Sequence, residues 1–233
     1  MICISCKTTY DTNFCPNCGE RSGVKKITLT SILEDALATL TNMDKGFLYN
    51  VKTLTLHPKT VAINYILGKR KGILNPISFL ILSVTVYLIV EGLFIPPLAD
   101  IGTETLPKAY VSRVAYSAGK YVHTYFKYFW ILSTIPLALS TTLVFRKYNF
   151  MEHLTINSFI IGQATLIGLI SYAILKVDMV INPLVYLCIF WLVYRIFMVK
   201  KNKLETGIMS VGVMVLFILQ LGVIALGIGI TMA

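Results

Sequence analysis

The sequence predicts an all-α integral membrane protein with about five transmembrane helices, and two observations predict it. Hydrophobic residues make up 56% of the chain and charged residues only 14%, a composition outside the range of soluble globular domains. Several apolar runs also approach or exceed the roughly 20 residues that a helix needs to cross the hydrocarbon core. These runs make residues 77–233 a transmembrane domain, with spans at about 77–97, 121–145, 154–175, 181–199 and 208–232.

The uneven distribution of Lys and Arg predicts the orientation of these spans. The region before Ile77 carries ten of them, and two more, Arg146 and Lys147, follow the second span. The connection between the fourth and fifth spans is basic as well, at residues 200–203. We therefore expect a cytoplasmic N-terminus and a C-terminus outside, with residues 98–120 forming a polar loop on the outer side.

Two Cys-x-x-Cys pairs near the N-terminus, Cys3 with Cys6 and Cys15 with Cys18, predict a metal site. Each pair presents two thiolates from one tight turn, and the eight residues between the pairs suffice for a short hairpin that brings them together. Four thiolates leave no open position on a tetrahedral ion, so we expect structural Zn²⁺ in a ribbon over residues 1–24. Two disulfides are the alternative, which a reducing cytoplasm disfavours.

Residues 25–76 form a basic region with helical periodicity between the ribbon and the first span. Apolar side chains recur every three or four residues over 27–40, 44–56 and 58–68, but none of these helices is long enough to cross a bilayer. Either they lie in the interface against anionic lipid headgroups, or they pack on one another and on the spans. The first alternative assigns headgroup contact to Lys69, Arg70 and Lys71.

Polar side chains inside the spans are costly unless they are partnered, so each is a candidate functional residue. Glu91 in the first span and His123 with Lys127 in the second lie at matching ends, and a pairing of Glu91 with one of them is the simplest explanation. This pair is either a structural clasp or part of a proton or ion path; the clasp is favoured because one acid cannot build a relay across the bilayer. Gln163 and Gln220 are expected to form hydrogen bonds between helices.

Small residues spaced four apart mark places where two membrane helices can approach closely. Ser158 with Gly162 and Ala225 with Gly229 are two such pairs. Pro136 in the second span predicts a kink, because proline cannot donate the helical hydrogen bond.

Arg146, Glu152 and His153 form a candidate interfacial site at the cytoplasmic start of the third span. A carboxylate beside an imidazole in a basic setting can bind metal or transfer a proton. Adjacent residues on a helix point about 100° apart, however, so Glu152 and His153 do not converge naturally on one ion. A structural role at the start of the helix is therefore favoured.

Several short motifs in the first two thirds of the chain resemble the DUF3667 family. They are Cys-Pro-Asn-Cys-Gly at 15–19, Met-Asp-Lys-Gly-Phe-Leu at 43–48, His-Pro-Lys at 57–59, Gly-Lys-Arg-Lys at 68–71 and Tyr-Asn-Phe-Met-Glu-His at 148–153. The resemblance implies a location in the bacterial cytoplasmic (inner) membrane, chiefly in Bacteroidota, and supports the zinc ribbon. It implies no activity, because no catalytic residues are established for the family.

The sequence favours a non-enzymatic membrane protein, because it contains no Walker loop, HExxH motif or nucleophile elbow. The leading hypothesis is recruitment of a cytoplasmic protein partner, or self-assembly, through the ribbon and the basic helices. Nucleic acid is not expected, since the basic residues flank apolar runs, where headgroups and topology account for them. The alternatives are a small-solute or ion transporter or channel subunit that uses the polar groups in the spans, and a membrane enzyme centred on Glu152 and His153.

Overall fold

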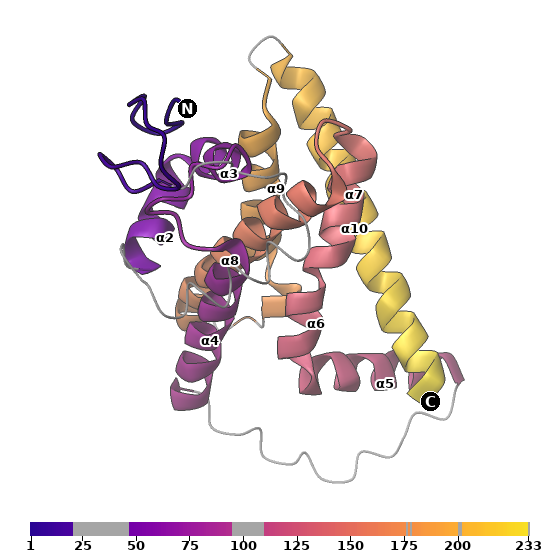
Figure 1. Cartoon of the computed structure of the whole chain (residues 1–233). Helices are drawn as coiled ribbons and strands as arrows, with labels where there is room; N and C mark the ends of the chain where they lie inside the picture. The colour runs from indigo at the N-terminus through magenta and orange to yellow at the C-terminus, as the bar shows by residue number, and fades with distance from the viewer. Residues whose placement is uncertain (21–46, 95–109, 176, 178, 200–201, 233) are drawn as a thin grey trace.

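The computed structural model describes residues 1–20, 47–94, 110–175, 177, 179–199 and 202–232 (Figure 1). The predicted helix over 27–40 and the first residues of the one over 44–56 lie outside this part, and so do the side chains of His123 and Lys127. The described chain is helical, apart from the N-terminal ribbon and the connecting turns. Its elements are α2 (Phe47–Leu56), α3 (Pro58–Ile66), α4 (Pro76–Phe94), α5 (Tyr110–Thr124), α6 (Phe126–Leu132), α7 (Thr134–Val144), α8 (Phe150–Leu175), the 3₁₀ turn η1 (Met179–Ile181), α9 (Pro183–Phe197) and α10 (Lys203–Met232).

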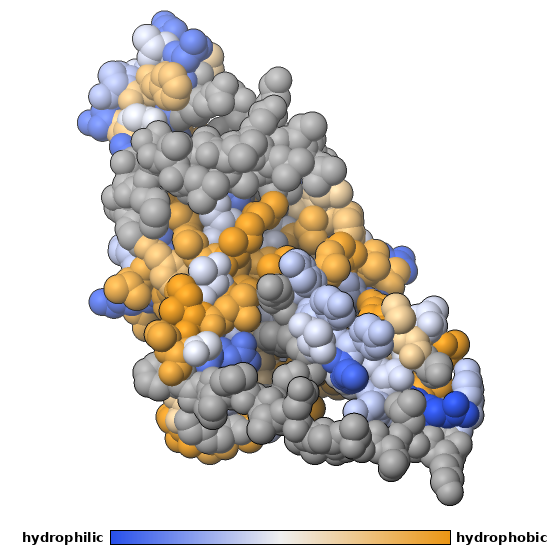
Figure 2. Space-filling view, turned by 90° about the horizontal axis from the view of Figure 1, so that it is seen from below, coloured by the Kyte–Doolittle hydropathy of each residue, from blue (hydrophilic) through white to orange (hydrophobic). Residues whose placement is uncertain are grey.

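Three of the described helices, α4, α8 and α10, are long and apolar enough to cross a membrane, which indicates a membrane protein. Many apolar side chains on the outer faces of these helices are exposed, as expected where lipid is the solvent. Figure 2 shows hydrophobic surface across the middle of the face seen from below, beside hydrophilic residues. The most exposed examples include Leu93, Ile174, Leu219 and Val223.

The two remaining predicted spans are shorter helices in the structure. The span predicted over 121–145 is divided into the end of α5, then α6 and α7, with breaks at Tyr125 and Ser133. Ser133 lies three residues before Pro136, which cannot donate a hydrogen bond to the carbonyl of Leu132, so the helix is interrupted where the kink was predicted. α9 has 15 residues and is about 22 Å long, less than the roughly 30 Å of the hydrocarbon core.

The prediction of a polar loop over 98–120 is wrong in its second half, because α5 begins at Tyr110. Figure 1 shows α5 lying crosswise at the C-terminal end of α10. Val114 and Ala118, one turn apart on α5, are buried there against Gly229 of α10. The apolar residues of α5 occupy only one face of the helix, so its mean hydropathy is low and a search for continuous apolar runs misses it.

α8 lies at the centre of the fold, packed against α4, α7 and α9. It approaches α4 closely at Gly162, where a Cβ would lie 2.7 Å from Cδ1 of Phe79. The rings of Phe79 and Phe159 are 5.9 Å apart, and Tyr65 of α3 meets Phe159 edge-on at 5.7 Å. α2 and α3 therefore pack on each other and on the bundle, as the second of the two arrangements expects. Their contact with lipid headgroups stays a prediction.

Candidate metal centre and its surroundings

The four N-terminal cysteines form a cluster that is placed to hold a metal ion, since their sulfur atoms all lie within 4.8 Å of one another. The Sγ atoms of Cys3 and Cys18 are 3.4 Å apart, and those of Cys6 and Cys15 are 3.5 Å apart. A tetrahedral ion with metal–sulfur distances of about 2.3 Å needs sulfur atoms about 3.8 Å apart. The donor set and its spacing therefore fit a closed four-sulfur site.

The two Cys-x-x-Cys turns have matching backbone geometry. The residue after each second cysteine has a positive φ, 64° at Lys7 and 70° at Gly19. In the first turn the Lys7 amide donates to the Cys3 carbonyl at 3.1 Å, and in the second the Gly19 amide donates to the Cys15 carbonyl at 2.7 Å. These hydrogen bonds hold each pair of thiols on one side of its turn, which is how about 20 residues without a core present four ligands.

The thiols of this cluster differ in acidity. Hydrogen bonds to the side chain and backbone of Thr8 lower the pKa of Cys6 to about 6. A hydrogen bond to the Glu20 backbone lowers the pKa of Cys18, but desolvation and the neighbouring thiols outweigh it and raise that pKa to about 12. At neutral pH the metal-free cluster thus carries a thiolate at Cys6 and a proton at Cys18.

The affinity of the cluster for a metal ion is expected to fall with decreasing pH. Binding must displace the Cys18 proton throughout this range, and below pH 6 it must displace the Cys6 proton as well, so the decline becomes steeper there. Competition with a chromophoric chelator between about pH 5.5 and 7.5 measures the effect. An affinity that does not change with pH would show that thiolates are not the ligands.

The basic turn, residues 68–73, follows α3 and lies beside the ribbon. α3 ends at Ile66, and Gly68, two residues further on, has a φ of 91°. There the Gly68 amide donates to the Tyr65 carbonyl at 3.1 Å and the Lys69 amide to the Asn64 carbonyl at 2.8 Å, the pair of bonds that closes a helix with a left-handed residue. The backbone of the basic turn is therefore fixed, and the directions of its lysines are set by it.

Two of the three residues predicted to contact lipid headgroups also lie near protein groups, and the headgroup contact itself stays a prediction. The guanidinium of Arg70 lies over the ring of Tyr65, 5.1 Å from its centre. The ammonium nitrogen of Lys71 lies 3.3 Å from the position that a Cβ on Gly19 would occupy, so it touches the ribbon. Lys69 and Lys71 also line a cavity of about 260 Å³ between the ribbon, α2, α3 and the basic turn.

Two asparagines that sequence reasoning passed over fix the junction between the basic turn and α4. Asn50 is buried on α2, and its side-chain oxygen accepts a hydrogen bond from the Leu74 amide at 2.8 Å. Asn75 caps α4 by accepting from the Ile77 amide at 3.0 Å, directly before Pro76. The Asn-Pro pair was a sequence signal for this cap, and the place of Asn50 among apolar residues was a signal for the buried bond.

The polar residues of the spans lie in separate places. Tyr87 donates to the Glu91 carboxylate at 3.3 Å within α4, and Gln163 of α8 donates to the Thr55 hydroxyl of α2 at 2.7 Å. Gln220 lies on α10. The predicted pairing of Glu91 with Lys127 or His123 stays a prediction, because those two side chains lie outside the described residues.

Glu152 and His153 point to different partners at the start of α8. Glu152 accepts from the Asn149 amide and Asn149 accepts from the Glu152 amide, both at 2.8 Å, which is a reciprocal capping box. The Nε2 atom of His153 lies 2.9 Å from the Phe145 carbonyl oxygen, and its ring stacks on Phe197 at 5.4 Å. Arg146 is exposed. The carboxylate of Glu152 and the imidazole of His153 therefore do not converge on one ligand.

Replacing Asn149 with alanine is expected to destabilise the protein by about 1 kcal/mol, because the first turn of α8 loses its cap. Thermal unfolding of the purified protein in detergent measures the effect. Lys147→Ala, at an exposed neighbouring position, is the control. Equal unfolding temperatures for the two variants would contradict the capping role.

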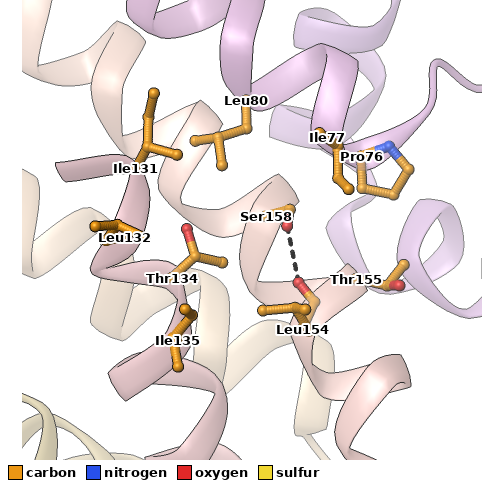
Figure 3. A pocket seen from close by; sticks show the side chains of 10 residues that line it. All are labelled: Pro76, Ile77, Leu80, Ile131, Leu132, Thr134, Ile135, Leu154, Thr155 and Ser158. Atoms are coloured by element: carbon orange, nitrogen blue, oxygen red, sulfur yellow. Dashed lines mark hydrogen bonds between the residues drawn. The ribbon is translucent and has the colours of Figure 1, made fainter. Parts of the chain in front are cut away.

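A second cavity, of about 190 Å³, lies between α4, α6, α7 and α8 (Figure 3). Its walls are mostly apolar side chains such as Leu80 and Ile131, and the Ser158 hydroxyl that faces it donates to the Leu154 carbonyl at 2.9 Å. None of the residues that line this cavity is charged.

Among known protein families, one family model matches part of the chain. The sequence model of the family described as "Protein of unknown function (DUF3667)" matches residues 44–88. No curated protein and no solved structure matches the chain. The matched region contains α2, α3, the basic turn and most of α4, so it comprises the surface on which the ribbon lies. The resemblance found in the sequence is therefore confirmed for residues 44–88, which match the DUF3667 family.

Proposed function

We propose that this chain is a non-enzymatic, multi-pass protein of the bacterial inner membrane whose zinc ribbon recruits a cytoplasmic protein partner. The observation that carries the proposal is the apolar surface of the ribbon. Met1, Ile2 and Phe14 are 67%, 66% and 59% exposed, although they belong to a segment of only about 20 residues. We infer that these exposed apolar groups contact a partner, as contiguous apolar patches on soluble modules do.

Zinc is the metal that this site favours. Four thiolates in tetrahedral spacing suit Zn²⁺, and a closed set of four leaves no position for substrate or water. The ribbon would therefore be structural, with the metal holding the two turns together so that they present their outer surface.

For the topology, we propose that α6 with α7 and α9 complete five crossings with α4, α8 and α10. The N-terminus is then cytoplasmic, where the cysteines stay reduced, and the C-terminus is outside. The ribbon (1–24), the basic helical region (25–76) and the membrane domain (77–233) form three successive parts. Lys69, Arg70 and Lys71 are the candidates for contact with lipid headgroups before the start of α4.

Site-specific photo-crosslinking tests recruitment. A photoreactive amino acid replaces Phe14 in the full-length protein in native membranes, and the control carries it at Leu204, which is 80% exposed on α10. We expect an adduct with one identified protein from Phe14, none from Leu204, and loss of the adduct in a Cys15→Ser, Cys18→Ser background at unchanged abundance. An adduct with a second copy of the chain would replace recruitment by self-assembly.

Two outcomes would contradict the proposal. The first is the absence of any adduct at Phe14. The second is the same set of adducts with and without the cysteine changes, since the ribbon would then not be the recruiting element. The alternative, transport through the spans, would then be tested by measuring solute flux in liposomes.

A further inference from the structure

We infer that the basic turn, residues 68–73, is the docking surface for the metal-loaded ribbon of the same chain, and that the ribbon leaves this surface when the metal is removed. The contact that carries the inference joins Lys71 to Gly19, with the ammonium nitrogen 3.3 Å from where a Cβ on Gly19 would lie. Gly19 directly follows Cys18, one of the four sulfur residues. A positive charge from residues 44–88, the part of the chain that matches the family model, is thus placed beside the metal site.

The ribbon side of this contact is negative when metal is bound. A Zn²⁺ ion with four thiolates has a net charge of about −2. Glu20, the residue after Gly19, is only 7% exposed and adds a carboxylate, to which the Ser5 hydroxyl donates at 2.8 Å. Without metal nothing joins the two Cys-x-x-Cys turns, so the turn that contains Gly19 is no longer held against Lys71.

The opposite side of the contact is positive and held in place. Lys69 and Lys71 line the cavity that Ser5 of the ribbon also lines. The glycines at 68 and 72 both have positive φ, and backbone hydrogen bonds close the turn around each of them. No carboxylate of the described residues forms an ion pair with either lysine. The negative metal site is therefore a well-placed counter-charge for them.

A free anion in the 260 Å³ cavity is a weaker interpretation of the same residues. Lys71 already touches the ribbon beside the metal site, where the negative charge of the metal-bound thiolates would offset its own. In this interpretation the metal-loaded ribbon supplies the negative charge that lies against the basic turn. This inference rests on the metal of the proposed function, but it does not depend on recruitment of another protein.

Hydrogen–deuterium exchange of the full-length protein in detergent tests the docking, with metal content measured on the same samples. We expect amides of residues 68–74 to exchange about fivefold faster after the metal is removed by a chelator, and similarly in Lys69→Gln, Lys71→Gln protein that still holds its metal. The control Lys52→Gln, Lys147→Gln makes the same charge change at two exposed positions outside the cavity and should match wild type. Lys71→Arg, which keeps the charge, should keep the protection.

Three results would overturn the inference. Unchanged exchange in metal-free protein would show that docking is independent of the metal, and a double variant that behaves like its control would show that the lysines do not hold the ribbon. In both cases the protein as purified would still contain its metal, so the proposed zinc site would stand. Wild-type protein without metal would instead overturn the zinc proposal and this inference together.

Discussion

Gly162→Leu is expected to separate α4 from α8 and to lower the unfolding temperature by about 5 °C or more. A Cβ at this position would lie 2.7 and 2.9 Å from two ring carbons of Phe79 and 3.3 Å from the Cα of Leu80. The Phe79 ring is itself fully buried against Phe159, so it cannot move aside without displacing further core groups. Thermal unfolding in detergent measures the loss.

Gly212→Leu is the matched control, because this glycine also lies on a long apolar helix but has nothing within 4 Å of its Cβ position. Phe79→Ala combined with Gly162→Leu should recover part of the lost stability, since the smaller side chain makes room for the new one. If Gly162→Leu and Gly212→Leu unfold at the same temperature, α4 and α8 are not in close contact at this point.

The second large effect is expected from Cys15→Ser combined with Cys18→Ser, which should unfold the ribbon and leave the helical bundle intact. Structural zinc contributes apparent binding energies of about 10 to 16 kcal/mol in small domains, far more than about 20 residues can gain by burial. Limited digestion with trypsin reports the change through cleavage after Lys7, which lies in the first turn of the ribbon.

The control for this experiment is Cys188→Ser, which changes a cysteine of α9 outside the metal cluster. We expect slow cleavage after Lys7 in wild type and control, rapid cleavage in the double variant, and one common unfolding temperature for the bundle. Equal cleavage in all three proteins would contradict a metal-dependent fold of the ribbon.

The parts of the fold that were predictable from sequence are those in which one local pattern decides the structure. Two Cys-x-x-Cys turns determine the sulfur cluster because the spacing alone brings the thiols together. α4, α8 and α10 follow from long apolar runs. The end of α8 is at the predicted residue, 175, and its start differs because a polar cap at Asn149 extends the helix before its apolar run. The small residue at Gly162 likewise marked a true close approach.

Other features depend on tertiary contacts and left little trace in the sequence. α5 is stabilised on one face only, by contacts of Val114 and Ala118 with α10, so its pattern resembled a polar loop. The direction of Lys71 depends on the positive φ of two glycines in its turn and on the position of the ribbon, neither of which the charge pattern contains. Glu152 was singled out for its neighbour His153, whereas its actual partner is Asn149, three residues earlier.

X-ray absorption at the zinc edge, together with metal analysis of the purified full-length protein, tests the central claim most directly. The proposed zinc ribbon predicts about one zinc ion per chain, with four sulfur neighbours at about 2.3 Å and no nitrogen or oxygen ligand. Protein that contains no metal, or whose four cysteines form disulfides, would contradict it. So would a zinc ion with nitrogen or oxygen in its first coordination sphere, because the four-cysteine cluster would then not be the site.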